Sequence, residues 1–491
     1  MVRLSLPRLP HVAFAVCLAL LCLPTLRGYS QQGVGGAGAL GGTGAGTGAG
    51  TGAGTGAGTG QGTLQLGGVE IDSQGVLRAR TVEDRQGNLT RQRMAAARAV
   101  LSRDVMKKSE LRKISLNRLE RALQAAIEAD KPISNDLLYL AGLNRITHVF
   151  YLPESKDIVI AGPAEGFYSD ISGKVRGLES GQSTIELRDL LVALRAYQPN
   201  GPTTSLVGVS IDPTQEGLKR LRSTIQQAQG NFREGMELEI VRALRDALGM
   251  QTVTIKGVSP KTHFAQVLAE ADYRMKLIGI GLENPSTKIT SFVSKVDPQK
   301  AAKNALNRWF FEPDYQCIEV DPDQTAMRLV GKGVKLIGEE ERIGADGKRQ
   351  QTGSSSRASQ AFCQSFTENF EALAQETPVF GELRNLIDMT IVAAFIQHAD
   401  LYEKAGWSME FLSDEVKLPL EVASPVAQVE PAINALWKGG VFMTPIGGGV
   451  AIYPRLALKP ENMKVDESGE IARIRDTVRV DQLGEVQWWW D

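Results

Sequence analysis

Residues that commonly bind metals or form disulfides are scarce in this chain of 491 residues. It holds four cysteines and four histidines, and no two histidines lie three or four positions apart. Neither Cys-x-x-Cys nor His-Glu-x-x-His occurs. The common structural zinc sites need such spacings, so we predict no metal site and no cofactor. With 42% hydrophobic and 23% charged residues, the composition is that of an ordinary globular protein.

A strong overall charge is also missing, because the formal net charge is only −1. Charge is concentrated locally, since Arg78–Arg121 holds 13 basic and 5 acidic residues. The favoured interpretation is the solvated outer face of two amphipathic helices. The alternative is a surface that binds an anionic polymer or lipid head groups through Arg91, Arg93, Lys107 and Lys108. Nucleic acid is not an expected partner, because aromatic residues for base stacking are absent from this segment.

The N-terminus predicts export. A short start with two arginines precedes the uncharged apolar run Val12–Leu23, and small residues follow. This order is typical of a secretory signal peptide over residues 1–30, cleaved after Gly28 or Ser30. The run is shorter than the roughly 20 residues of a membrane-spanning helix, although an uncleaved anchor is the alternative. We therefore expect a periplasmic, envelope-associated or secreted protein without a transmembrane helix after signal removal.

Residues 31–68 follow as a predicted linker. Within them, Thr-Gly-Ala-Gly units recur with a four-residue period, and glycine at every second position gives the chain much freedom to lose on folding. We expect a disordered tether, with silk-like sheet stacking as the alternative. The rest divides by pattern into 69–130, a hairpin with basic helices, 131–308, an α/β part, and 309–491, a β-rich and helical part.

The local patterns predict a mixed α+β fold of two closely packed parts. Alternating residues indicate hairpins at Val69–Ala79 and between residues 146 and 161. Ser115 is a predicted helix cap, and Asp212 with Pro213 predicts another helix start. Strands are expected for Lys288–Val296 and after a tight turn at residues 447–449, and buried helices for several apolar stretches, among them Pro378–Gln397.

Two cysteines remain after signal removal, Cys317 and Cys363. An even pair in an oxidising compartment is compatible with one disulfide. The alternative is two buried free thiols that behave as small apolar residues. Sequence spacing does not decide between these alternatives.

Catalytic motifs are absent or incomplete. Gly208–Asp212 resembles a nucleophile elbow around Ser210, but Asp212 replaces the required last glycine. The remaining catalytic candidates are carboxylates that could serve a hydrolase in a cleft between the two parts, if two of them converge there. These residues are Asp212, Glu216, Glu270 and Asp272, for which helix caps and surface salt bridges are the alternative roles.

Two further features need partners. Arg384, Asn385 and Asp388 occupy one turn of an otherwise apolar helix, so they require polar contacts and are candidates for tying the two halves together. The run Trp488–Trp490 near the C-terminus either packs back on the fold or contacts another molecule.

Several blocks of sequence resemble one family. SerIleAspProThrGlnGluGlyLeu at 210–218 and AlaAspTyrArgMetLys at 271–276 are two of them, and related blocks occur within 114–166 and 380–388. They resemble exported planctomycete proteins catalogued as domain of unknown function 1598. The resemblance implies an exported bacterial protein and transfers no reaction, cofactor or catalytic residue.

The sequence therefore favours a non-enzymatic exported module that binds a protein partner or an anionic envelope polymer. This hypothesis depends on the missing catalytic constellations. A hydrolase that uses the four carboxylates is the alternative, and convergence of two of them in a concave pocket would favour it.

Overall fold

The computed structural model describes residues 66–82, 84, 86–227, 235–297, 305–421, 424–437, 441–443, 446–481, 483–484 and 486–491. The predicted signal peptide, residues 1–30, lies outside them, as do residues 31–65 of the predicted linker. Residues 66–68, the end of that predicted linker, belong to the first strand.

The described chain has the mixed α+β architecture that the sequence predicts. Its larger sheet has nine strands in the order β1-β2-β15-β9-β8-β18-β10-β13-β14. Most neighbours are antiparallel, whereas β18 pairs in parallel with β10, and β15 with β2. The strands are β1 (Leu66–Ile71), β2 (Val76–Thr81), β8 (Val207–Pro213), β9 (Gln251–Lys256), β10 (Ala305–Pro313), β13 (Val334–Ile343), β14 (Arg349–Gln351), β15 (Gln428–Val429) and β18 (Ile446–Ile452).

A second sheet has seven strands in the order β19-β11-β12-β4-β5-β3-β20. Strands from each of the three predicted segments, 69–130, 131–308 and 309–491, take part in both sheets, so each sheet draws on the whole described chain. The strands are β3 (Ser109–Ser115), β4 (His148–Leu152), β5 (Asp157–Ala164), β11 (Ile318–Val320), β12 (Ala326–Leu329), β19 (Met463–Val465) and β20 (Trp489–Trp490), with the separate pairs β6 (Phe167–Ser169)–β7 (Val175–Gly177) and β16 (Ala435–Trp437)–β17 (Val441–Met443).

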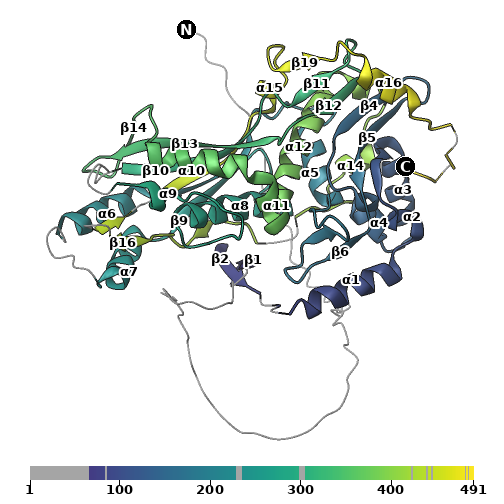
Figure 1. Cartoon of the computed structure of the whole chain (residues 1–491). Coiled ribbons are helices and arrows are strands. Elements are labelled where there is room, and N and C mark those ends of the chain that lie inside the picture. Colours follow the sequence, from purple (N-terminus) through teal and green to yellow (C-terminus); the bar gives the residue numbers. More distant parts are fainter. Residues whose placement is uncertain are drawn as a thin grey trace, which may run out of the picture. The chain divides into compact units, whose positions relative to one another are not determined.

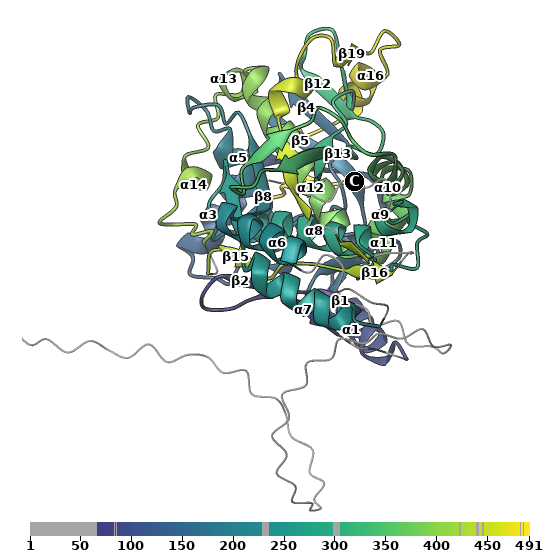
Figure 2. The same ribbon diagram turned by 90° about the vertical axis from the view of Figure 1, so that its left-hand side faces the viewer.

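Helix α12 (Pro378–His398) lies between the two sheets, and α5, α8 and α11 pack against it (Figure 1). Figure 2 shows the same central position after a quarter turn. The other helices lie around the sheets. They are α1 (Asn88–Val100), α2 (Arg103–Met106), α3 (Leu116–Glu128), α4 (Asn135–Leu138), the 3-10 turn η1 (Leu140–Gly142), α5 (Leu187–Ala196), α6 (Gln215–Gln227), α7 (Glu237–Leu248), α8 (His263–Gly279), α9 (Phe292–Lys295), α10 (Arg357–Glu368), α11 (Phe370–Glu376), α13 (Leu401–Ala405), α14 (Glu410–Ser413), α15 (Pro454–Ala457) and α16 (Glu470–Thr477).

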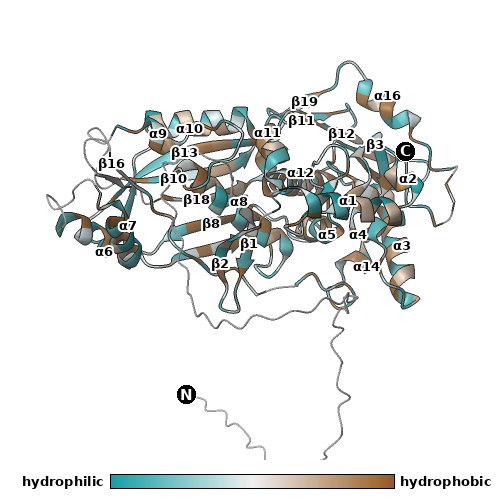
Figure 3. Cartoon of the chain, turned by 60° about the horizontal axis from the view of Figure 1, so that its bottom comes forward, coloured by the Kyte–Doolittle hydropathy of each residue, from teal (hydrophilic) through white to brown (hydrophobic). Residues whose placement is uncertain are grey.

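One large cluster of buried apolar side chains joins both sheets to α12. Every residue of α12 from Val379 to Ile396 is buried, so this mostly apolar helix is enclosed on all sides and presents no face to solvent. In Figure 3, brown residues gather on strands in the interior, while the outer helix α6 is mostly teal. Within the described ranges, no helix combines the length and apolar content needed to cross a bilayer.

Several local predictions are confirmed. The first hairpin is β1–β2 and the second is β4–β5. Helix α3 begins after Ser115, whose hydroxyl accepts a hydrogen bond from the Arg118 amide at 3.2 Å. A side chain that satisfies a free N–H group at a helix start accounts for this boundary. The tryptophans pack back on the fold, because β20 pairs with β3 and Trp488 is buried.

Three local predictions are wrong. Asp212 and Pro213 end strand β8, and Thr214 caps α6 by accepting from the Gly217 amide at 3.0 Å. The segment predicted as a strand at Lys288–Val296 contains the short helix α9. The glycines at 447–449 form the middle of β18 instead of a turn.

The crowding around β18 explains its glycines. A Cβ atom on Gly448 would lie 1.9 Å from the Trp309 carbonyl oxygen, and one on Gly449 would lie 1.9 Å from that of Val209. Gly448 also has a φ of +140°, which L side chains rarely adopt. Glycine therefore lets β18 fit between β8 and β10.

Candidate anion-binding pocket

One turn of helix α12 places three polar side chains inside the core, in addition to the buried Glu382 and Thr390 elsewhere on the helix. Arg384 is 7% exposed, Asn385 2% and Asp388 1%, on a helix whose other buried residues are mostly apolar. Burying such groups is unfavourable unless they find partners. The partners of these three residues therefore define what this turn of α12 does.

Two of the three side chains tie α12 to the segment before β4. Asn385 donates from Nδ2 to the backbone oxygen of Asn144 at 2.9 Å. Asp388 accepts from Arg145 Nε at 2.7 Å, and Arg145 also donates from Nη1 to the Gly331 oxygen at 3.1 Å. The carboxylate of Asp388 raises the pKa of Arg145, so this arginine stays charged. These contacts support the prediction that the polar turn joins distant parts of the chain.

Arg384 differs from its two neighbours. It makes no hydrogen bond and no ion pair with any residue in the described part of the chain, and its buried Nε atom has no partner. Burial and the nearby positive charge of Arg145 lower the pKa of Arg384, whereas the negative charges of Asp388 and Glu371 act in the opposite direction. An arginine in a protein nevertheless stays protonated. The fold thus holds in its interior a guanidinium cation that makes no direct hydrogen bond or ion pair with the described residues.

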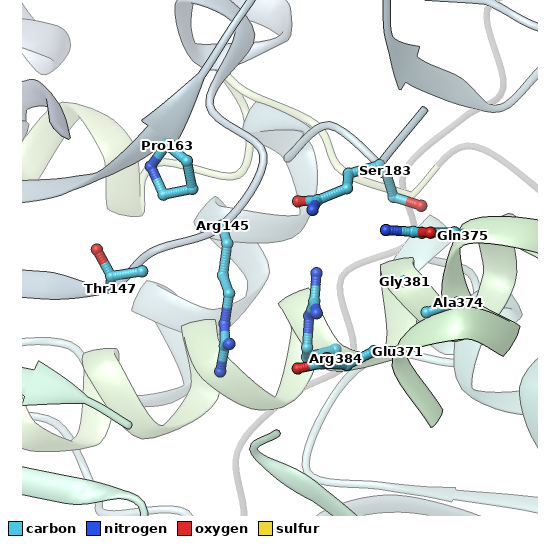
Figure 4. Close-up of a pocket in the computed structure, with 10 residues that line it drawn as sticks. Arg145, Thr147, Pro163, Ser183, Glu371, Ala374, Gln375, Gly381 and Arg384 are labelled. Atoms are coloured by element: carbon cyan, nitrogen blue, oxygen red, sulfur yellow. The ribbon is translucent and has the colours of Figure 1, made fainter. Parts of the chain in front are cut away.

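This guanidinium faces a cavity of about 270 Å³. Arg145 lines the same cavity, and its Nη2 atom is also buried without a hydrogen-bond partner among the described residues. Figure 4 shows the end of Arg384 extending from α12 into the space bounded by Arg145, Ser183 and Gln375. The other lining residues are Thr147, Pro163, Gln182, Glu371, Ala374 and Gly381. We call this cavity the arginine pocket.

The arginine pocket has the chemistry of an oxyanion site. Guanidinium groups present N–H donors in a planar fork that matches the two oxygens of a carboxylate or phosphate. The serine and glutamine side chains in the lining add polar groups. The one lining carboxylate, Glu371 on α11, is exposed and forms no ion pair with the described residues. The cavity is slightly smaller than the roughly 300–1,000 Å³ of drug-sized ligand sites, so it suits a small anionic group.

Three of the four candidate catalytic carboxylates form ion pairs in the described structure. Asp212 pairs with Arg308 at 3.1 Å and with Arg349 at 2.8 Å, and Glu216 is exposed on α6. Asp272 pairs with Lys276 at 2.8 Å, and burial raises the pKa of Asp272 to about 6.

Glu270 lines a cavity of about 250 Å³, where it pairs with Lys174 at 3.1 Å. Ion pairing thus accounts for Asp212, Glu270 and Asp272, but not for Glu216, and no observation points to the hydrolase alternative.

The candidate basic surface lies far along the chain from these groups. Helix α1 has no buried residue, and it carries Arg91 and Arg93. Arg93 donates to the backbone oxygen of Asp170 at 2.6 Å. Lys107 lies 3.7 Å from Asp491, and Lys108 is exposed. The exposure of this surface is compatible with either interpretation of its charge.

Cys317 and Cys363 are both buried free thiols, so the disulfide alternative is not formed. The Cys363 sulfur faces Gly338 of β13, where a Cβ atom would lie 3.2 Å from it. Cys317 lies where Asp388 and Arg145 influence its ionisation. Burial raises the pKa of each thiol to about 12, which makes both poor nucleophiles.

Comparison with known proteins supports one of the sequence-based expectations. Residues 209–292 match the model of DUF1598, a family of proteins of unknown function. The predicted resemblance to this family is thereby confirmed over a segment that runs from β8 through α8 to the start of α9. No curated protein and no solved structure matches the chain. The matched family brings no reaction or ligand with it, so the functional argument must come from the site.

Sequence reasoning found part of the arginine pocket. The sequence shows three polar residues on one turn of an otherwise apolar helix, namely Arg384, Asn385 and Asp388. Arg145 was missed, because it lies 243 positions from its partner Asp388 and belongs to no motif. The lack of a partner for Arg384 is a tertiary property that no spacing in the sequence encodes.

Proposed function

We propose that this protein is an exported, non-enzymatic binding module, and that the arginine pocket binds an acidic group carried by a polymer of the cell envelope. The observation that carries the proposal is the unpaired, buried Arg384. A buried charge without a partner costs several kcal/mol of stability, and an anionic ligand would relieve that cost. Such a locally unfavourable arrangement is more common at functional sites than elsewhere.

The geometry favours binding over catalysis. Two arginines can hold an oxyanion in a fixed orientation, but the described lining contains no histidine, cysteine or buried carboxylate that could act as a base or nucleophile. The small volume suits one acidic group, with the rest of a polymer outside the cavity. The export signal predicted for residues 1–30 would bring the protein to the envelope, where such polymers occur.

Isothermal titration calorimetry tests the proposal. The probes are galacturonic acid, which supplies a carboxylate on a sugar, inorganic phosphate, and uncharged galactose. We expect binding of at least one acidic probe to one site per chain, a tenfold or greater loss of affinity in Arg384→Met, and no binding of galactose. A tenfold loss corresponds to about 1.4 kcal/mol, which is typical of one charged hydrogen bond.

Arg91→Met is the matched control, because it removes an exposed arginine of the candidate basic surface. It should leave the affinity unchanged. If Arg91→Met weakens binding and Arg384→Met does not, the basic surface is the binding site and the arginine pocket is not. If neither acidic probe binds, or if galactose binds equally well, the proposed recognition of an acidic group is wrong.

A further inference from the structure

A second buried polar cluster lies on the other side of the first turns of α12, where α5 and α8 approach it. We define the His263 cluster as Glu186, Asp189, His263 and Glu382. Asp189, on α5, is 4% exposed and lies 2.9 Å from His263 Nδ1. A carboxylate accepts hydrogen bonds, so in the neutral imidazole Nδ1 carries the proton and Nε2 offers its lone pair.

Three potential metal-ligating atoms converge in this cluster. His263 and a carboxylate oxygen from each of Glu186 and Glu382 place their ligand atoms within 4.8 Å of one another. Zinc–nitrogen and zinc–oxygen distances are about 2.0–2.2 Å, so modest side-chain rotation would bring all three atoms onto one ion. Their side chains are 14%, 12% and 7% exposed, respectively, which limits the competition from water.

Each of the three residues keeps one potential ligand atom that makes no hydrogen bond with the described residues. No described residue forms a hydrogen bond with His263 Nε2. One oxygen of Glu382 accepts from Lys174 at 2.5 Å, whereas its other oxygen has no hydrogen-bond partner in the described chain. One oxygen of Glu186 pairs with Arg188 Nε at 2.8 Å, and its other oxygen has no hydrogen-bond partner in the described chain.

The charges around the cluster support a cation. Five carboxylates belong to the connected network, and three permanent cations face them. When His263 is neutral, the ion-paired network has two more carboxylates than permanent cations, and one further cation, Arg80, lines the adjoining cavity, so the surroundings keep an excess of negative charge. The carboxylates are Glu186, Asp189, Glu270, Glu283 and Glu382, and the cations are Lys174, Arg188 and Arg274.

A cavity of about 250 Å³ adjoins the cluster and provides an approach for an ion. His263, Lys174 and Glu270 line it together with residues of β1. One oxygen of Glu270, a residue that is 4% exposed, is buried there without a hydrogen-bond partner among the described residues. The cluster thus combines a ligand set, an excess of negative charge and an entrance.

We propose that Glu186, His263 and Glu382 bind one divalent transition-metal ion, with Asp189 as the positioning residue for the imidazole. One imidazole nitrogen with two carboxylate oxygens suits Zn²⁺ and its neighbours in the first transition row better than Mg²⁺ or Ca²⁺, which prefer oxygen ligands only. A fourth coordination position is left for water from the cavity. Because these ligands come from three distant segments, the absence of a zinc motif in the sequence does not argue against the site.

The test is a calorimetric titration of chelator-treated full-length protein with Zn²⁺, with Mg²⁺ and Ca²⁺ as further arms. We expect one Zn²⁺ per chain and at least 100-fold weaker binding in both His263→Gln and Glu186→Gln. Asp189→Asn should weaken Zn²⁺ binding by about 10- to 100-fold, as is usual when the carboxylate behind a ligating histidine is removed. His398→Gln is the matched control, because His398 is exposed on the end of α12.

Cobalt provides a readout that a purely structural role of His263 would not change. Bound Co²⁺ should give visible absorption bands in wild-type protein, and His263→Gln should lose them while its far-ultraviolet circular dichroism is retained. The proposal is overturned if no Zn²⁺ binds, if His398→Gln reduces binding as much as His263→Gln, or if Mg²⁺ binds as tightly as Zn²⁺. Arg384→Met should leave Zn²⁺ binding intact, so failure of the arginine-pocket proposal would be a separate result.

Discussion

Replacing Arg384 by methionine should stabilise the ligand-free protein. Methionine has a similar length and flexibility but no charge, so the substitution removes an unpaired cation without leaving a large void. The full cost of an unpaired buried charge is several kcal/mol, but Arg384 is 7% exposed and meets the solvent of a 270 Å³ cavity. We therefore expect a gain of about 1–2 kcal/mol in the free energy of unfolding.

Urea denaturation followed by tryptophan fluorescence measures this change. The midpoint should rise while the slope of the transition stays constant, since the surface exposed on unfolding is nearly the same. Arg145→Met is the contrasting variant, because it deprives the buried Asp388 of its ion-pair partner and should lose about 3–5 kcal/mol. A loss of 1 kcal/mol or more in Arg384→Met would refute the reasoning, because it would mean that the guanidinium stabilises the fold.

Three further predictions concern the rest of the molecule. Burial lowers the pKa of His148 to about 4 from its usual 6.5, so the stability that its neutral form contributes is present above pH 6.5 and lost as the pH falls toward 4. Urea titrations at pH 6.5 and pH 4 should show that His148→Gln removes about 3 kcal/mol of that acid-dependent loss, and an unchanged pH dependence would contradict the assignment. Gly448→Ala should cost about 3 kcal/mol or prevent folding, whereas Gly484→Ala, where a Cβ atom meets nothing within 4 Å, should be nearly neutral in thermal unfolding. Mass spectrometry of the native N-terminus should find a start just after Gly28 or Ser30, and an intact Met1 would contradict the predicted signal cleavage.

Patterns within a few residues predicted the local structure well. Ser115 satisfies free N–H groups at the start of α3, and alternating residues marked both hairpins, because these effects act between neighbours in the chain. Asp212 shows the limit of such reasoning. Its carboxylate pairs with Arg308 and Arg349, which are far away in sequence, and Thr214 takes the cap position instead.

Two features were not predicted for a related reason. They are the position of the β18 glycines inside a strand and the partners of the polar residues in the arginine pocket. Gly448 looked like a turn residue, but its role is set by the Trp309 carbonyl of a neighbouring strand. The polar turn of α12 indicated where buried partners were needed. It could not show that Asp388 finds Arg145 whereas Arg384 finds no partner. Long-range pairing decides both features, and a single sequence does not reveal it.

The binding claim is tested most directly by crystals soaked in selenate, a tetrahedral oxyanion with a strong anomalous signal. The account predicts an anomalous peak in the arginine pocket, within hydrogen-bonding distance of the Arg384 guanidinium, and its loss in crystals of Arg384→Met. Peaks confined to the surface around Arg91 and Lys108, with none beside Arg384, would contradict it.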